Sequence, residues 1–220
     1  MGTIERRERE REELREKIVE AARDILSERG LEGFSMREIA RRIEYSPATI
    51  YLYFANKEEL LRAVVGEGMR RLSEVIRNEI DAAGPVTAAQ KYRASGRGYV
   101  RFALENTAYF HVIFDLPAVA HMEEDCPGHT ESLDQAAFER VVGVLKQACR
   151  EGSYRADLDV EQAAVIGWAT LHGLLSLYLS GHLQEFAPTR DQFQVLVERS
   201  LDMIGLAWRT PVESNAADAA

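Results

Sequence analysis

Apolar residues recur along the chain at the three- and four-residue intervals of amphipathic helices, and the alternation typical of strands is nearly absent. The first series predicts a helix over residues 12–29, ended by Gly30. Its apolar face would hold Leu14, Ile18, Ala21, Ala22, Ile25 and Leu26. The Glu- and Arg-rich run that begins at Glu5 is expected to be a solvated, fraying extension of this helix, with a DNA-contacting arm as the alternative.

A second, shorter helix is predicted directly after a serine. Ser35 can accept a hydrogen bond from the first turn, and Glu38, three residues later, can reach back to complete a capping box. The apolar positions of this helix are Met36, Ile39, Ala40 and Ile43. Helical spacing leaves the basic side chains largely on other faces; they are Arg37, Arg41 and Arg42.

Two more helix starts follow closely. Ser46 can cap a helix with Pro47 at its first position, where the missing N–H leaves no hydrogen bond unmade. Asn56 can cap the next helix, which begins at Lys57 and carries Glu59 where a capping box needs it. The pattern therefore predicts two short helices, a tight turn between them, and the start of a long helix.

This arrangement, packed on a preceding helix, describes a helix-turn-helix DNA-binding domain. The helix over residues 47–54 would be the recognition helix, which enters the major groove. Ile50 and Phe54 lie four residues apart and would share its buried face. Tyr51 and Tyr53 would then point elsewhere, with hydroxyls available to phosphate oxygens.

Residues 15–62 resemble the N-terminal signature of the tetracycline-repressor family of bacterial regulators, which runs S-x-R-x-I-A, a turn, S-x-x-T-[LI]-Y-x-x-F and K-E-x-L. The matching residues are Ser35, Arg37, Ile39, Ala40, Ser46, Thr49, Ile50, Tyr51, Phe54, Lys57, Glu58 and Leu60. Two positions depart from the family pattern, because Glu44 stands in the turn and Ala48 precedes Thr49 where glycine is common. A left-handed Glu44 would cost about 1 kcal/mol.

The resemblance implies an all-α protein with a three-helix DNA-binding domain and a larger helical domain that binds a small molecule and dimerises. The expected boundaries are 1–62 for the N-terminal extension and DNA-binding domain, 63–209 for the effector-binding and dimerisation domain, and 210–220 for a disordered tail. Family members change the spacing of their recognition helices through the helix that joins the two domains. Gly66 and Gly68 in that helix are interpreted either as a local hinge or as sites of close packing.

The DNA contacts are assigned by position in the predicted domain. The side chains expected to hold phosphates are Ser35, Arg37, Tyr51, Tyr53 and Lys57. The residues expected near base edges, around the cap Ser46, are Tyr45, Pro47, Ala48 and Thr49. Because Pro47 and Ala48 offer only apolar contact, sequence preference would rest on Tyr45, Thr49 and DNA shape. In a dimer, two recognition helices about 34 Å apart would read a pseudo-palindrome.

Residues 163–181 contain no Asp, Glu, Lys or Arg. Their length would allow a membrane span, but their glycines, serines and His172 favour a helix covered partly by its own domain and partly by a second subunit. Trp168, His172 and Gly173 resemble a tryptophan-histidine-glycine (WHG) motif of a subgroup of the family. By resemblance, this helix and the last one, residues 190–209 after a threonine cap, would form a four-helix interface with their symmetry mates.

Aromatic residues gather in the stretch 99–115. We interpret them as the wall of an effector cavity, because apolar rings with a few polar groups make small-molecule sites; an ordinary core is the alternative for any single ring. The residues expected in this wall are Tyr99, Phe102, Phe110, His111, Phe114, Trp168 and His172.

Composition and charge suit a soluble regulator. With 46% apolar and 29% charged residues, a chain of 220 residues can bury a core and keep a polar surface. Of the net charge of −9, residues 66–220 hold −8, so the acidic excess lies outside the predicted DNA-binding domain. Two scattered cysteines, Cys126 and Cys149, and the polar start of the chain favour a reducing, cytoplasmic location.

The leading hypothesis is a dimeric, ligand-responsive transcriptional regulator, usually a repressor in this family; a nonspecific architectural DNA-binding protein is the alternative. The expected partners are a double-stranded operator, a small-molecule effector and a second copy of the chain. Nucleophile-elbow, phosphate-loop and dinucleotide motifs do not occur, so we expect no catalysis and no cofactor. His121, Glu123, Cys126 and His129 could suggest a metal site, but their spacing favours an exposed loop without one.

Overall fold

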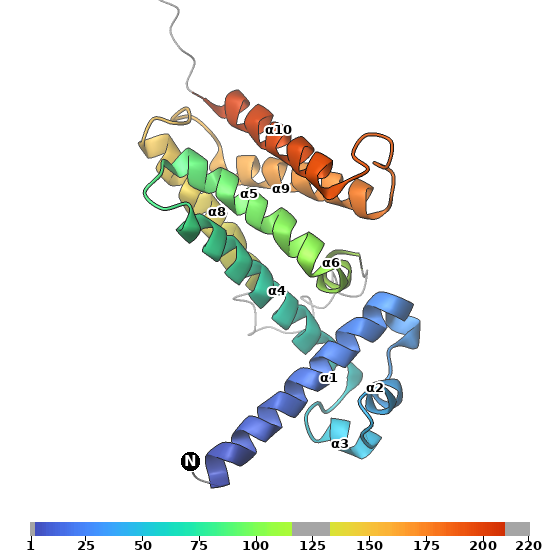
Figure 1. The fold of residues 1–220 in the computed structure, drawn as a ribbon. Coiled ribbons are helices and arrows are strands. Elements are labelled where there is room, and N and C mark those ends of the chain that lie inside the picture. Colours follow the sequence, from blue (N-terminus) through green and yellow to red (C-terminus); the bar gives the residue numbers. More distant parts are fainter. Residues whose placement is uncertain (1–2, 116–132, 210–220) are drawn as a thin grey trace, which may run out of the picture. The chain divides into compact units, whose positions relative to one another are not determined.

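The computed structural model describes residues 3–115 and 133–209 of the chain (Figure 1). Every regular element in these two ranges is an α-helix, which confirms the predicted all-α fold class. The described residues form two compact units: the first unit comprises residues 3–71 and 102–115, and the second unit comprises 72–101 and 134–209. The functional boundary expected near residue 62 stays a prediction, because compactness and function need not divide a chain at the same residue.

Helix packing around one apolar core builds the first unit. Its helices are α1 (Thr3–Gly33), α2 (Met36–Arg42), α3 (Pro47–Tyr51), the first part of α4 (Lys57–Ala82), the last turn of α5 (Ala88–Glu105) and α6 (Thr107–Phe114). Helix α2 packs against α1, and α3 against α2 (Figure 1). The fully buried residues of these helices include Ile18, Ala22, Ile39, Ile50, Leu60 and Val64.

Helix α1 is longer than the hydrophobic pattern indicates. It begins at Thr3 rather than at residue 12, and its exposed residues 5–13 continue the helix that the apolar series starts. Gly30 has φ 60° and ψ −162°, which is outside helical geometry, so the chain kinks at the residue where the sequence predicts the helix to end. Charged residues at regular spacing are compatible with a solvated helix, which the apolar pattern alone does not reveal.

The predicted caps form as the sequence indicates. The hydroxyl oxygens of Ser35 and Ser46 each accept a backbone N–H from the third residue along, at 3.2 Å, and Asn56 accepts that of Glu59 at 2.7 Å. The return bonds of the two capping boxes differ from expectation. The carboxylate of Glu59 accepts the N–H of Ala55, and that of Glu38 binds arginines.

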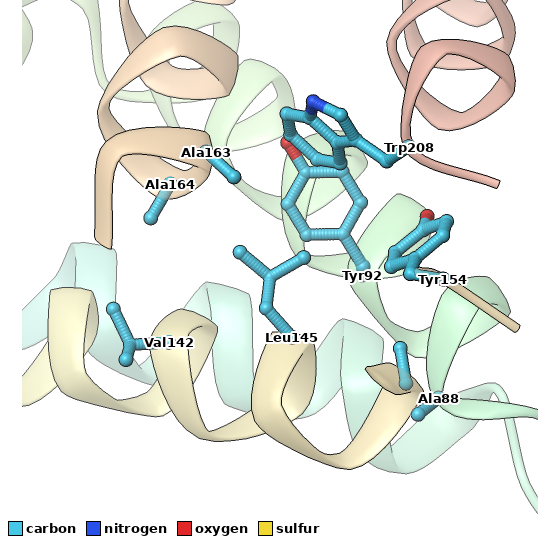
Figure 2. Close-up of a cluster of buried hydrophobic side chains, with 9 residues drawn as sticks. Ala88, Tyr92, Val142, Leu145, Tyr154, Ala163, Ala164 and Trp208 are labelled. Carbon is cyan, nitrogen blue, oxygen red and sulfur yellow. The ribbon is translucent and has the colours of Figure 1, made fainter. Parts of the chain in front are cut away.

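The second unit holds the rest of the long helices. It contains the remainder of α4, most of α5, α8 (Leu133–Arg150), α9 (Val160–Leu179) and α10 (Arg190–Trp208). Three aromatic rings lie in its core. The centre of the Tyr92 ring lies 5.3 Å from that of Trp208 and 6.5 Å from that of Tyr154, and both ring pairs are edge-to-face (Figure 2). Helix α10 begins with a complete capping box between Thr189 and Gln192, which confirms the threonine cap.

The two glycines of α4 have different environments. A Cβ atom on Gly68 would lie 2.8 Å from Cδ1 of Ile113 and 2.9 Å from Cδ1 of Tyr109, so this glycine lets α6 approach α4 closely. A Cβ atom on Gly66 would meet nothing within 4 Å. Close packing therefore accounts for Gly68, and the hinge interpretation of Gly66 stays a prediction.

Candidate nucleic-acid interface

A strained turn sets the direction of α3. Glu44 has φ 61°, so this non-glycine residue of the turn adopts the left-handed conformation. The N–H of Tyr45 then donates to the carbonyl of Ala40 at 2.9 Å, which closes the end of α2. Ser46 caps the next helix and Pro47 occupies its first turn, so α3 starts immediately after the turn.

Two apolar side chains fix α3 to the core and leave its opposite side uncovered. Ile50 is 0% exposed and Phe54 2%, as the four-residue spacing predicts. Tyr45 is 45% exposed, Tyr51 54% and Leu52 76%, which is unusual for large apolar side chains in such a short segment. The helix ends at Tyr51 instead of near Phe54, because the chain turns at residues 52–53.

The remaining predicted base-edge residues lie on this uncovered side. Ser46, Pro47 and Ala48 are exposed, and Thr49 is half-buried with its hydroxyl 2.9 Å from that of Ser46. Leu52, the most exposed large apolar residue of the segment, is absent from the predicted contacts. Its place between two tyrosines was the available signal, since a leucine there could not share the face of Ile50 and Phe54.

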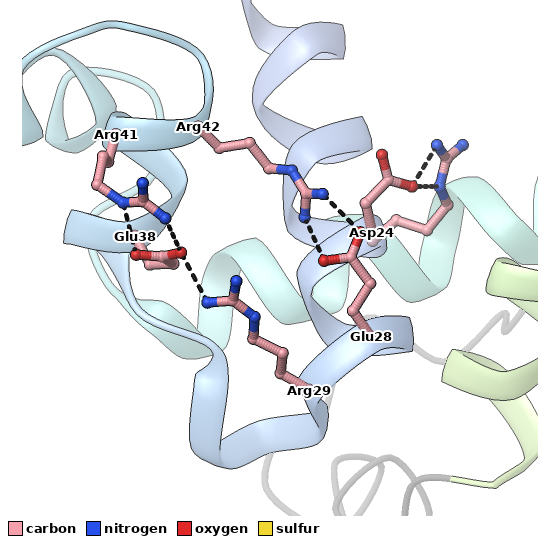
Figure 3. A network of polar contacts seen from close by, with 7 residues as sticks. Asp24, Glu28, Arg29, Glu38, Arg41 and Arg42 are labelled. Carbon is pink, nitrogen blue, oxygen red and sulfur yellow. Dashed lines mark hydrogen bonds and ion pairs between the residues drawn. The ribbon is translucent and has the colours of Figure 1, made fainter.

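Ion pairs reduce the number of unpaired arginines on and around α2. The carboxylate of Glu38 accepts hydrogen bonds from Arg41 and Arg29, and Glu28 of α1 accepts two from Arg42 (Figure 3). The hydrogen bond from Arg42 lowers the pKa of the Glu28 carboxyl, and that from Arg41 lowers the pKa of Glu38. Arg41 and Arg42 are therefore each paired with a carboxylate that is ionised at neutral pH.

Arg37 differs from its basic neighbours. Its side chain is exposed, and it forms no ion pair with any residue within 3–115 or 133–209. The hydroxyl of the exposed Ser35 is occupied by its capping bond, although a hydroxyl oxygen can still donate its proton to a phosphate. Of the three arginines on α2, only Arg37 thus offers an uncompensated charge.

Lys57 and Tyr53 are both half-buried and both contact residues of the same unit. The ammonium of Lys57 donates to the carbonyl of Leu31 at 3.1 Å and lies 5.4 Å from the ring centre of Phe34. The ring of Tyr53 lies under the guanidinium of Arg11, 6.0 Å from the ring centre. The predicted phosphate roles of both residues must coexist with these internal contacts.

The residues predicted for the effector cavity divide between the two units. In the second unit, the indole N–H of Trp168 donates to the hydroxyl of Tyr99 at 3.0 Å, and that hydroxyl lies 2.8 Å from Nδ1 of His172. Because an indole N–H only donates, the Tyr99 hydroxyl accepts from Trp168 and can donate its own proton to Nδ1 when the imidazole carries its proton on Nε2. Three predicted residues thus form one hydrogen-bonded group.

The other four predicted cavity residues belong to the first unit. Phe102 and Phe110 are buried, and the ring of Phe114 lies 5.1 Å from that of Phe110. The imidazole of His111 pairs with Asp115 through Nδ1 and lines a cavity of about 300 Å³ with Leu26, Ser27, Gly30 and Asp115. Whether all seven residues line one cavity stays a prediction, and the segment 121–129 lies outside the described residues.

Helices α9 and α10 keep large apolar side chains exposed. These are Val165, Ile166, Trp168 and Leu177 of α9 and Val195, Met203 and Leu206 of α10. By length and composition alone, α9 is also the helix within the described ranges that could cross a membrane. Its buried residues recur at helical spacing, at Ala163, Gly167, Leu171 and Leu175, so α9 already has one face packed inside its own unit.

Comparison with known proteins agrees with this geometry. Residues 18–64 match the family model of bacterial regulatory proteins of the tetR family, and residues 92–200 match that of the tetracyclin repressor-like C-terminal domain. The chain is similar to the transcriptional regulator UidR of Escherichia coli K12, with 36% identity over 30% of this chain and 34% of UidR. It is also similar to the transcriptional repressor KstR2 of Rhodococcus jostii, with 24% identity over 68% of this chain and 72% of KstR2.

Solved structures with a similar fold include regulators of the same family. A TetR family transcription regulator from Marinobacter aquaeolei VT8 superposes with a TM-score of 0.72 at 19% identity, over 92% of this chain and 100% of that one. The relatives are transcriptional regulators rather than enzymes. Taken with the capped, tyrosine-bearing helix α3 on its three-helix core, these matches show that the chain belongs to the tetR family of bacterial DNA-binding transcriptional regulators.

Proposed function

We propose that this protein is a dimeric repressor that binds a pseudo-palindromic operator through α3 and releases it when a small molecule binds. The DNA-binding role rests mainly on one observation: α3 is buried on one side and exposed on the other. Ile50 and Phe54 hold the helix on the core while Tyr45, Tyr51 and Leu52 are left uncovered. A groove-reading helix needs this combination, because it must be rigid on one side and accessible on the other.

The exposed residues in and next to α3 suggest how bases would be read. Pro47, Ala48 and Leu52 offer apolar contact, which suits the methyl group of thymine, while the hydroxyls of Tyr45 and Thr49 can bond to base edges. Arg37 would hold a phosphate, because it is exposed and its charge is uncompensated. Sequence preference would then rest on few hydrogen bonds and on DNA shape.

A second copy of the chain is the occupant that we propose for the apolar faces of α9 and α10. Ile166 is 54% exposed, Met203 70% and Leu206 58%, so water contacts large apolar surfaces on both helices of one chain. Self-association through a two-fold axis would cover these surfaces in pairs, since the same patch serves both partners. The pairing would also place two α3 helices on one operator.

The effector is proposed to contact the predicted aromatic residues, with Tyr99, Trp168 and His172 supplying the polar groups. Trp168 provides a direct reporter, because the chain has two tryptophans and the other, Trp208, is 6% exposed in the core. In a Trp208→Phe variant, the tryptophan fluorescence comes from Trp168 alone. A compound that releases the DNA should change this emission, and release without any change would place the effector elsewhere.

Binding to DNA tests the core of the proposal. The purified protein is titrated with the DNA upstream of its own coding sequence and with random DNA of equal length, at matched salt. A repressor should prefer its own site by at least a thousandfold, the lower range for specific binding. Equal affinity for both DNAs at every salt concentration would indicate a nonspecific architectural protein and would remove the proposal.

A further inference from the structure

The N-terminal turns of α1 lie outside the part of the chain that family membership explains. The family model begins at residue 18, whereas α1 begins at Thr3. Residues 5–13 are exposed, and Figure 1 shows these turns extending past α2 and α3. A segment that buries nothing and is nevertheless helical has a surface available for a partner.

Contacts with aromatic rings place this extension beside the proposed DNA-reading segment. The guanidinium carbon of Arg11 lies 6.0 Å from the ring centre of Tyr53, and that of Arg15 lies 5.3 Å from the ring centre of Phe54. Both rings follow α3 directly in the chain. Such cation–π contacts are worth about 0.5–1 kcal/mol at exposed sites, which is enough to orient the arginines.

Helical spacing sorts the charges of the extension by face. Arg7, Arg11 and Arg15 follow one another at four-residue intervals, so they form a single stripe along α1. The stripe continues the side of α1 on which Ile18 and Ala22 are buried. It therefore runs outward from the core along the side that contacts Tyr53 and Phe54.

The arginines also differ in their ion pairs. Arg6 pairs with Glu10 at 3.3 Å and Arg9 with Glu13 at 3.9 Å, each at i,i+4. Arg7 and Arg11, in contrast, form no ion pair with any residue of the described ranges. The extension has almost no net charge, yet two uncompensated guanidinium groups remain on the stripe.

We propose that Arg7 and Arg11 bind phosphates of the DNA backbone that flank the bases read by α3. The inference depends on the proposed DNA-binding function and adds a second, sequence-independent contact to it. Arg11 lies beside the ring of Tyr53, and Arg7 lies about 6 Å farther along the helix axis. Guanidinium groups bind phosphate oxygens bidentately, so two such groups would extend the footprint beyond the groove.

A charge-matched pair of variants of the full chain tests the inference. Arg7→Gln/Arg11→Gln removes the two uncompensated arginines, and Arg6→Gln/Arg9→Gln removes two paired ones from the same helix. Glutamine has nearly the helix propensity of arginine, and circular dichroism checks that α1 remains helical. The DNA is a duplex that wild-type protein selects from a random-sequence pool, with flanks long enough to pass beyond the selected site.

The measured quantity is the slope of log affinity against log salt concentration. For Arg7→Gln/Arg11→Gln we expect the slope to fall by about 1.8 per subunit, about 0.9 for each lost phosphate contact, with the base preference unchanged. The control variant should retain most of the wild-type slope. Equal slopes for wild type and Arg7→Gln/Arg11→Gln would overturn the inference, and so would equal losses in both variants, because the latter would reflect net charge alone.

The outcome also separates this inference from the proposed function. A wild-type protein that prefers no sequence contradicts the repressor proposal, whatever the arginines do. A wild-type protein that selects a site, together with an unchanged Arg7→Gln/Arg11→Gln variant, contradicts only the phosphate-binding role of the extension.

Discussion

Nζ of Lys57 lies 3.1 Å from the main-chain oxygen of Leu31 and donates a hydrogen bond to it. The contact joins the start of α4 to the last turn of α1, and the ammonium lies near the ring of Phe34 as well. An ammonium has three donors, so two remain for a phosphate. Lys57 can therefore stabilise the DNA-binding unit and bind DNA at once.

Replacing Lys57 with Met keeps the aliphatic stem and removes the charge. We expect the free energy of unfolding without DNA to fall by about 1 kcal/mol, because the carbonyl of Leu31 loses its donor. We also expect the salt slope of DNA binding to fall by about 0.9 per subunit. Denaturant unfolding and salt titration measure the two effects separately. A lower stability with an unchanged slope would limit Lys57 to a structural role.

Glu44 should be strained, because its φ of 61° disfavours any residue with a Cβ atom. A Glu44→Gly variant is expected to have a free energy of unfolding roughly 1 kcal/mol above that of Glu44→Ala. The alanine variant is the matched control, since it also loses the carboxylate but keeps the Cβ atom. Denaturant titration of both proteins gives the comparison, and equal stabilities would show that the turn tolerates the conformation at no cost.

Alanine at the two glycines of α4 should have opposite effects. Gly66→Ala is expected to raise the free energy of unfolding by roughly 0.5–1 kcal/mol, because it improves helix propensity and meets no neighbour. Gly68→Ala is expected to lower it by about 1–2 kcal/mol, because the new methyl group would overlap the ring of Tyr109.

The ring of Tyr109 has little room to move away from that methyl group. The guanidinium carbons of Arg23 and Arg71 each lie 4.9 Å from its centre. Thermal and denaturant unfolding of the two alanine variants check the prediction. Stabilisation by both substitutions would mean that α6 can shift from α4 without loss.

Exposed apolar residues in different parts of the chain should separate dimerisation from DNA binding. Met203→Glu places a charge on the α10 face that is proposed to meet a second copy, so the dimer should dissociate at micromolar concentration. Leu52→Glu places the same charge beside α3, so the dimer should persist while operator affinity falls. Sedimentation and DNA titration of both variants test this, and a dimeric Met203→Glu protein would argue against the proposed interface.

Local sequence signals predicted the DNA-binding unit well because its structure depends on neighbouring residues. The caps at Ser35, Ser46 and Asn56 act within three residues, and the burial of Ile50 and Phe54 follows from helical spacing. The hydrophobic pattern places the start of α1 too late in the chain for a related reason. Its first turns have no apolar face, so the pattern that locates helices has nothing to detect there.

Contacts between distant residues could not be predicted in the same way. Glu38 and Arg41 lie three residues apart in α2, so helical spacing could indicate their ion pair, but only the packing of α2 on α1 brings Glu28 to Arg42. The close approach of α6 to Gly68 joins segments about forty residues apart in the chain, and no local pattern encodes it.

The sequence by itself therefore determined the all-helical class and the starts of the capped helices α2, α3, α4 and α10, because propensity, caps and spacing act over a few residues. Only the tertiary structure decided which charged groups remain uncompensated, including Arg37, Arg7 and Arg11. The physical reason is that an ion pair depends on the three-dimensional positions of both partners, and those positions are set by the packing of the whole core.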